Sequence, residues 1–173
     1  MLFRSALARG GYDRSQIGAL FFVSVTGVAN PSIDARLMNR MHLPHDVKRM
    51  PIFGLGCVAG AAGIARASDY VRAFPKQIAV LLSVELCTLT LQRDDLTLAN
   101  LVACGLFGDG AAAVVVAGAE CGPVSRENQH NGPEVLDTQS MFYPGTEDLM
   151  GWDISEKGFQ IVLSRDVPKV ARE

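Results

Sequence analysis

The sequence is short of the features that mark membrane, secreted and nucleic-acid-binding proteins. Its apolar runs, such as residues 17–25 and 78–84, are much shorter than the roughly 20 residues that a membrane-spanning helix needs. No apolar segment with a small-residue cleavage site follows Met1, so we expect no signal peptide. Lysine and arginine form no stripe interleaved with aromatic residues, which argues against nucleic acid as a partner. We therefore expect a cytoplasmic protein.

Motifs for several common kinds of site are also absent. The cysteines form no C-x-x-C pair, so neither a disulfide framework nor a zinc site is expected, and we predict no metal and no cofactor. A serine hydrolase is disfavoured because no G-x-S-x-G motif occurs. A dinucleotide-binding fold remains as a rival, since a glycine-rich turn lies between a predicted strand and helix and Glu85 ends the next strand. However, its glycines at 54, 56 and 60 are one residue out of step with G-x-G-x-x-G.

What is present is the composition of a globular protein with a substantial core. The chain has 173 residues, of which 49% are hydrophobic and 20% charged, with a net charge of −2. Strand-like and helix-like apolar segments alternate along its first part, which predicts an α/β layered fold with a largely parallel sheet. Two regions are expected, 1–119 and 120–173, and the second begins with a polar, turn-rich connector over residues 121–133.

The pattern of apolar and turn residues gives the order of the elements. Ser32 is placed to cap one helix, and Asp94 or Asp95 to open another. The helix that follows Cys57 begins with small residues on every side, which predicts that it is buried all round. We expect helices over residues 2–8, 33–41, 58–73 and 94–107, a further helix opening at 165–168, and strands over 17–25, 47–53, 77–84, 111–116, 135–143 and 159–163.

Cys57 is the candidate nucleophile, because it lies at a strand-to-helix turn at the amino end of the small-residue helix. Unpaired N–H groups and the helix dipole favour a thiolate there, and the flanking glycines let a substrate approach. The alternative is a small packing residue, and position alone leaves the two readings about equally supported. The remaining cysteines are expected to be packing or surface residues, and the histidines to be solvated: Cys87, Cys104 and Cys121; His42, His45 and His130.

Four segments, in order and spacing, resemble the type III polyketide synthases, which are the chalcone synthase-like enzymes of the thiolase superfamily. These motifs are highly specific for the family, but they say little about which product a member makes. The last of the four is most similar to the bacterial branch. The segments are residues 25–31 (Val-Thr-Gly-Val-Ala-Asn-Pro), 56–60 (Gly-Cys-Val-Ala-Gly), 106–113 (Leu-Phe-Gly-Asp-Gly-Ala-Ala-Ala) and 159–168 (Phe-Gln-Ile-Val-Leu-Ser-Arg-Asp-Val-Pro).

The resemblance implies a thiolase-like fold and an acyltransferase. Cys57 would take an acyl group from acyl-CoA and extend it by decarboxylative condensation with malonyl-CoA. In the family, an asparagine and a histidine in an H-P-G motif complete the site, both in the carboxyl half of the fold. None of the three histidines here precedes Pro-Gly, and no asparagine follows Glu134. Complete members of the family are about twice as long, so we expect an incomplete chain that is inactive alone.

The resemblance also implies residues of the substrate cavity. Phe107 corresponds to a phenylalanine between the CoA tunnel and the cavity. The other expected substrate-binding residues are Cys87, Val25, Thr26, Ile161 and Trp152. Cys87 and Ile161 depart from the plant pattern, which favours a bacterial type that takes fatty acyl starters and releases pyrones or resorcinols. The alternative for Phe107 and Ile161 is an ordinary place in the core.

Asn30 and Pro31 are expected to form a cis peptide beside the interface of a homodimer, because the matching loop of plant members reaches towards the partner. Two further interpretations stay open. One is a condensing enzyme of the ketoacyl synthase III type, which shares the cysteine at the start of a helix. The other is a non-catalytic remnant or a dimerising partner.

Overall fold

The computed structural model describes residues 2–124 and 132–172, and it divides into two compact units. Unit 1 consists of Met1–Val84 and Ala111–Gln139, and unit 2 of Glu85–Gly110 and Ser140–Glu173. Each unit therefore takes two separate stretches of the chain. The sequence-based boundary after residue 119 refers to the two halves of the expected thiolase-like fold, which are not the same as these compact units. That boundary stays a prediction.

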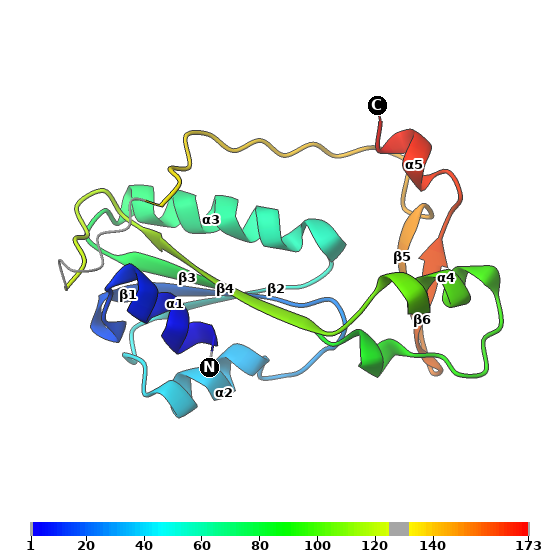
Figure 1. The fold of residues 1–173 in the computed structure, drawn as a ribbon, viewed down its shortest axis with the longest axis horizontal. Coiled ribbons are helices and arrows are strands. Elements are labelled where there is room, and N and C mark those ends of the chain that lie inside the picture. The colour runs from blue at the N-terminus through cyan, green and yellow to red at the C-terminus, as the bar shows by residue number, and fades with distance from the viewer. Residues whose placement is uncertain (1, 125–131, 173) are drawn as a thin grey trace. The chain divides into compact units, whose positions relative to one another are not determined.

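Unit 1 is built on a four-stranded sheet with the order β2-β1-β3-β4 (Figure 1). β1 is parallel to both β2 and β3. The N–H of Gly118, just after β4, donates to the carbonyl of Gln77, just before β3, so β4 runs antiparallel to β3. The predicted, largely parallel sheet is thus confirmed. The strands are β1 (Ile17–Val23), β2 (Lys48–Ile52), β3 (Ile78–Glu85) and β4 (Gly110–Ala117).

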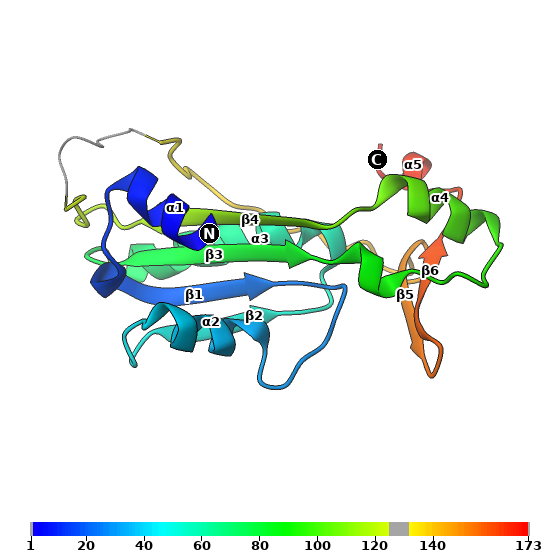
Figure 2. The same cartoon turned by 60° about the horizontal axis from the view of Figure 1, so that its bottom comes forward.

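Helices cover both faces of this sheet, as Figure 2 shows. α1 (Leu2–Gly10) and α2 (Ile33–Met41) lie on one face, and α3 (Ala59–Ala73) lies on the other. Because β1 is covered on both sides, all seven of its residues are buried, which explains its continuous apolar run. Alternate residues of β1 pack into the two cores, for example Leu20 towards α1 and α2, and Phe21 towards α3.

Only one side of α3 is buried, so the prediction of burial all round is wrong for the described residues. Gly63 lies against the sheet, where a Cβ would stand 2.6 Å from Cδ1 of Leu81. This close approach explains the small residues on the inner side of the helix. On the outer side Ala61 is exposed, and Val58, just before the helix, is 59% exposed. Near the end of the helix, the exposed Arg72 donates to the carbonyls of Val135 and Leu136 in a loop of unit 1.

Unit 2 contains α4 (Leu98–Leu106), a 3-10 turn at Cys87–Thr90, a hairpin of β5 (Met150–Ser155) and β6 (Gly158–Leu163), and the short α5 (Val167–Val170). β5 and β6 are antiparallel, with Ser155 opposite Gly158 at the turn. Gly158 has φ 91°, a left-handed conformation that favours glycine. α5 carries Pro168 in its first turn, as the sequence predicts.

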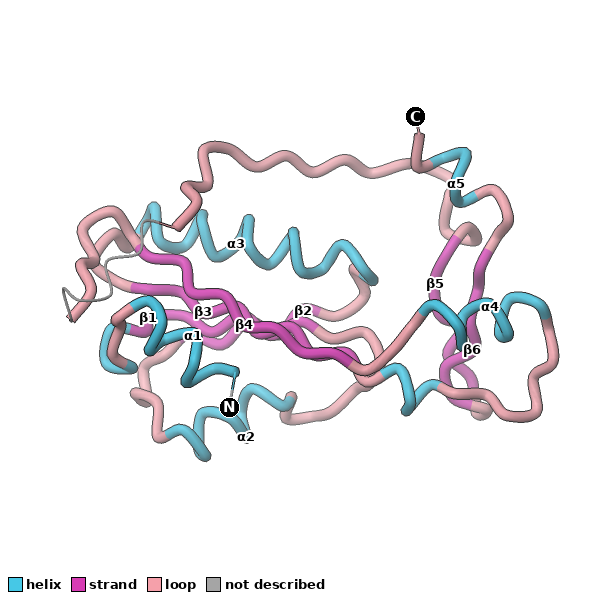
Figure 3. The backbone as a smooth tube through the Cα atoms, in the orientation of Figure 1, coloured by secondary structure: helices cyan, strands magenta, loops and turns pink. Residues whose placement is uncertain are grey.

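Three sequence-based expectations are corrected here. Residues 135–143 form no strand and are drawn as loop in Figure 3. β5 was not predicted. α4 begins after Thr97, whose hydroxyl accepts from the N–H of Asn100, and not at Asp94 or Asp95. Within residues 2–124 and 132–172, none of the helices has the length and apolar character needed to cross a bilayer.

Candidate active site

Cys57 lies in a 3-10 turn (Gly56–Val58) that joins β2 to α3, as the sequence predicts. Gly54 and Gly56 have φ values of 90° and 56°, so the turn uses conformations that other residues adopt only with strain. A Cβ added at Gly54, Gly56 or Gly60 would meet nothing within 4 Å. The thiol is exposed in the structure and has open space beside it, as a nucleophile for a large substrate requires.

The thiol stands at the amino end of α3, a helix of 15 residues. The N-cap residue, Val58, makes no side-chain hydrogen bond to the first turn. The positive end of the helix dipole therefore faces the region of Cys57 without a capping oxygen from that residue. The oxyanion that forms when a thiol attacks a carbonyl group carries a negative charge, which this end of a helix stabilises.

Val25 and Thr26, predicted to bind substrate, lie at the same edge of the sheet of unit 1 as Cys57. They follow β1, and Cys57 follows β2. The last residues of these parallel strands, Val23 and Ile52, are register partners. Thr26 is buried and Val25 half-buried. In parallel sheets ligands bind outside the carboxyl ends of the strands, so this edge is the expected place for a substrate.

The other predicted substrate-binding residues belong to unit 2. Cys87 is half-buried in the 3-10 turn that follows β3, and Phe107 is the half-buried C-cap residue of α4. Trp152 and Ile161 are direct partners across the β5–β6 hairpin. The rings of Trp152 and Phe159 meet edge to face, with their centroids 6.0 Å apart. The structure thus places Trp152 beside Ile161, while the substrate-binding roles of all four remain predictions.

Asn30 and Pro31 are joined by a cis peptide bond, as predicted, and both residues are exposed. Their place in a dimer interface stays a prediction. His42 and His45 line an open pocket of about 720 Å³ between α2 and the start of β2. Cys57 is not among the residues that line this pocket. His130 lies outside the described residues.

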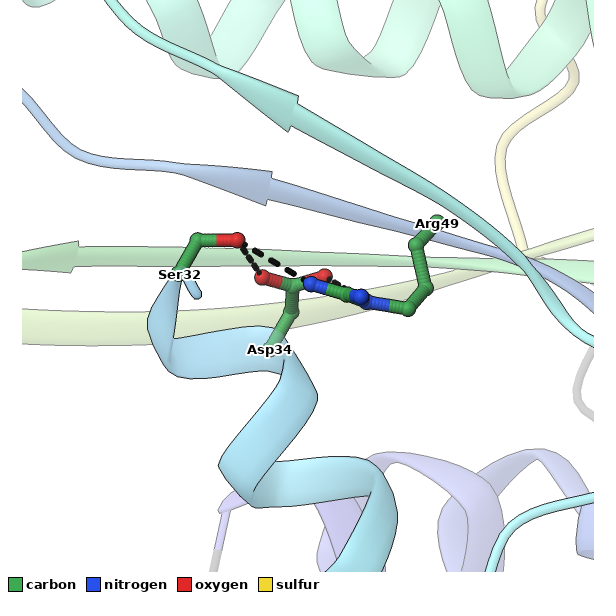
Figure 4. Close-up of polar contacts among 3 residues, drawn as sticks. All are labelled: Ser32, Asp34 and Arg49. Carbon is green, nitrogen blue, oxygen red and sulfur yellow. Dashed lines mark hydrogen bonds and ion pairs between the residues drawn. The ribbon is translucent and has the colours of Figure 1, made fainter. Parts of the chain in front are cut away.

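The sequence analysis missed polar clusters in both units. In unit 1 the carboxylate of Asp34 binds Ser32 and Arg49 (Figure 4). In unit 2 the carboxylate of Asp109 accepts hydrogen bonds from the N–H and the hydroxyl of Thr88, both at 2.8 Å. These bonds hold the pKa of Asp109 below its usual value. The Gly-Asp-Gly turn was visible in the sequence, but its partner, 21 residues away, was not.

Comparison with known proteins agrees with this geometry. The family profile described as the N-terminal domain of chalcone and stilbene synthases matches residues 3–121. A 1,3,6,8-tetrahydroxynaphthalene synthase from Streptomyces peucetius subsp. caesius is 52% identical over 167 residues, which are 96% of this chain and 43% of that protein. Phloroglucinol synthase from Pseudomonas fluorescens is 34% identical over 164 residues, 95% of this chain and 45% of that protein.

Solved structures show the same likeness. The 1,3,6,8-tetrahydroxynaphthalene synthase of Streptomyces coelicolor A3(2) matches with a TM-score of 0.88 and 34% identity, over 97% of this chain and 46% of that one. Germicidin synthase of Streptomyces coelicolor matches with a TM-score of 0.85 and 31% identity, over 99% and 43%. The fold is therefore of the thiolase-like class of condensing enzymes. The chain belongs to the chalcone and stilbene synthase family, the type III polyketide synthases, and spans less than half the length of these relatives.

The four cysteines give a direct test of the nucleophile. We expect iodoacetamide to modify Cys57 faster than Cys87, Cys104 and Cys121 in the folded protein at neutral pH. Cys104 is the matched comparison, because it is also exposed but lies in the last turn of α4, at the negative end of a helix. Cys121 should react slowest, since burial raises the pKa of its thiol. Peptide mapping after brief labelling measures the order, and equal labelling of Cys57 and Cys104 would contradict an activated nucleophile.

Proposed function

We propose that this chain supplies the nucleophile of a type III polyketide synthase. Cys57 takes an acyl group from an acyl-CoA thioester, and the acyl chain is then extended with units from malonyl-CoA. The observation that carries the proposal is the exposed Cys57 at the strand-to-helix turn, in a chain whose residues 3–121 match the chalcone and stilbene synthase family. Membership of that family also favours this activity over a ketoacyl synthase III type.

The first half-reaction is a transfer between two thioesters. The thiolate of Cys57 attacks the carbonyl carbon of acyl-CoA, and a tetrahedral intermediate forms. The bond from that carbon to the sulfur of CoA then breaks, and CoA leaves as a thiol after it takes up a proton. The new thioester keeps the acyl group activated for carbon–carbon bond formation, which is why a cysteine suits this step better than a serine.

Decarboxylation of malonyl-CoA gives the second half-reaction its nucleophile. Loss of carbon dioxide leaves the enolate of a CoA thioester, and its carbon attacks the carbonyl carbon of the acyl group on Cys57. The bond from that carbon to the sulfur of Cys57 then breaks, which releases the cysteine and leaves the extended chain on CoA. Donors that hold the enolate oxygen lower the barrier of such a step by several kcal/mol. The family uses an asparagine and the histidine of an H-P-G motif for this purpose. In the 173 residues no histidine precedes Pro-Gly and no asparagine follows Glu134, so we assign this half-reaction to the complete enzyme.

Residues for the acyl cavity of the complete enzyme are proposed in each unit separately. We assign this role to Val25 and Thr26 of unit 1, and in unit 2 to the residues Cys87, Phe107, Ile161 and Trp152. The names of the relatives, a tetrahydroxynaphthalene synthase at 52% identity and a phloroglucinol synthase at 34%, support a hydroxylated aromatic polyketide as the product class. The alternative from the cavity residues is a fatty acyl starter that leads to a pyrone or resorcinol.

The complete enzyme is proposed to be a cytoplasmic homodimer, with the loop at Asn30 and Pro31 at its interface. The exposure of both residues supports this placement. So does the packing of the following segment, because Ser32 and Asp34 are bound to Arg49 of β2 and hold the base of the loop against the sheet.

Acyl loading is the step that tests the proposed function on this chain. We expect intact-mass spectrometry, after incubation with a series of acyl-CoAs, to show one added acyl group, and peptide mapping to place it on Cys57. A Cys57→Ala variant should take up no acyl group there. Acylation that persists in the Cys57→Ala variant, or that is as strong on the exposed Cys104 as on Cys57, would show ordinary thiol exchange. Either result would overturn the proposal.

A further inference from the structure

The loop of residues 86–97 in unit 2 is fixed by side chains to which neither the sequence pattern nor the family resemblance assigned a role. It begins with the 3-10 turn that carries Cys87 and ends just before α4. At its first part, Asp109 accepts two hydrogen bonds of 2.8 Å from Thr88, one from the backbone N–H and one from the hydroxyl. Asp109 is two residues from Phe107, so these bonds join the turn of Cys87 to the turn of Phe107.

The middle of the same loop is held from the other side. The side-chain amide of Gln92 donates to the carbonyl of Phe159 on β6 at 3.2 Å. The backbone carbonyl of Gln92 in turn accepts from the side-chain amide of Asn100 at 2.9 Å, and the same amide also donates to the backbone carbonyl of Asp95 at 2.6 Å. Asn100 is only 6% exposed, so this link between α4, the loop and β6 is sheltered from water.

Together these bonds connect the four places in unit 2 that carry predicted substrate-binding residues. Asp109 connects the turn of Cys87 with that of Phe107. Gln92 connects the loop with β6, where Phe159 contacts Trp152 and lies two positions from Ile161 on the same face of the hairpin. A side chain that lines a cavity is useful only if its support is rigid, and polar bonds from neighbouring elements are a common source of that rigidity.

We propose that Asp109 and Gln92 are positioning residues of the acyl cavity, which hold the loop of Cys87 between the Phe107 turn and the β5–β6 hairpin. They act through Cys87, Phe107 and the hairpin and touch no reacting atom. Their effect is on which acyl chains fit, and not on the attack by Cys57. The role in the acyl cavity rests on the proposed function, whereas the effect of the hydrogen bonds on the loop can be tested without it.

The reactivity of Cys87 reports directly on the position of the loop. Cys104, on α4 of the same unit, is the internal reference. We expect Asp109→Ala to raise the ratio of Cys87 to Cys104 alkylation about tenfold, since two hydrogen bonds are lost. Asp109→Asn should stay near the wild type, because an amide can accept from the N–H of Thr88 and donate to its hydroxyl. Thr88→Val should give a smaller rise of a few-fold.

An unchanged ratio in both Asp109→Ala and Thr88→Val overturns the positioning role. If Asp109→Ala also shifts the fluorescence of Trp152 on β5 to that of the unfolded chain, unit 2 has unfolded, and the milder Thr88→Val decides. Gln92→Ala, which removes only the bond to β6, should raise the same ratio as well.

The consequence for specificity is tested by acyl loading. Wild type, Asp109→Ala and Asp109→Asn are each incubated with short-chain and long-chain acyl-CoAs, and the amounts of each acyl group on Cys57 are compared by mass spectrometry. We expect Asp109→Ala to change the preference a few-fold and Asp109→Asn to restore it. If Asp109→Ala speeds the alkylation of Cys87 but leaves the acyl-chain preference unchanged, Asp109 holds the loop in place without shaping the cavity. That result would overturn its proposed role as a positioning residue of the cavity. Absence of any acyl group in the wild type would overturn the proposed function instead. The alkylation ratios would still show whether Asp109 and Gln92 hold the loop of Cys87 in place.

Discussion

Incubation of this 173-residue chain with acyl-CoA and malonyl-CoA is expected to give acylated Cys57 and no polyketide. Transfer of the acyl group needs a nucleophile and some stabilisation of one oxyanion, and the amino end of α3 can contribute to both. Condensation needs an enolate held beside the thioester as well. Loss of a single donor for such an oxyanion typically costs a factor of about 100 to 1,000 in rate. With neither the H-P-G histidine nor the later asparagine in the chain, we expect product below detection.

Mass spectrometry of the small molecules released from the incubation measures this directly, with Cys57→Ala as the control. A second polypeptide that carries the H-P-G motif and the asparagine should restore condensation if it can associate with the chain. A pyrone, a resorcinol or a hydroxylated aromatic above the Cys57→Ala background, without any such addition, would show that other residues of this chain stabilise the enolate.

The part of the fold that follows from local sequence pattern was predictable. α2 has the predicted bounds because Ser32, Asp34 and the apolar spacing are all local signals. β1 was predicted from its unbroken apolar run, although its last two predicted residues lie in the loop. The turn at Cys57 followed from its glycines, two of which have positive φ. In each case neighbours in the sequence determine the conformation.

What was missed depends on contacts between distant residues. β5 contains a glycine and an aspartate, which disfavour strands, and it is a strand because β6 pairs with it. The segment 135–143 has strand-like side chains but no partner strand among the described residues, so it stays a loop. Ser32 stands at the N-cap of α2, yet its hydroxyl binds Asp34 instead of a backbone N–H, because Arg49 brings the three groups together.

Replacement of Asp34 by alanine is expected to destabilise unit 1 by roughly 3 kcal/mol, at the lower end of the range for a broken buried ion pair. Asp34 is fully buried, and Nε of Arg49 lies 2.6 Å from its carboxylate. Without Asp34, the guanidinium and the Ser32 hydroxyl lose their acceptor beside the sheet. The Arg49 side chain is 35% exposed, so it can recover part of its hydration, which keeps the cost at the lower end.

Asp34→Asn separates the charge from the hydrogen bonds. The amide can still accept from Arg49 and contact Ser32, so we expect a loss of only about 1 kcal/mol at neutral pH. Burial by itself raises the pKa of Asp34, but the hydrogen bonds from Arg49 and Ser32, with the charge of Arg49, outweigh it and hold the pKa below its usual value. The carboxylate therefore stabilises the fold above about pH 4, and this contribution is lost as the pH falls through the lowered pKa.

The wild type and Asp34→Asn should consequently differ most near neutral pH and converge in acid. Urea unfolding followed by circular dichroism measures both variants across this range. Most helical residues belong to α1, α2 and α3 of unit 1, so circular dichroism reports mainly on that unit. The fluorescence of the single tryptophan, Trp152, reports on unit 2 instead. A difference between wild type and Asp34→Asn that stays constant from neutral pH into acid would contradict a stabilising charge. Equal losses in Asp34→Asn and Asp34→Ala would show that the hydrogen bonds of the amide contribute nothing and that the charge of the carboxylate accounts for the whole loss.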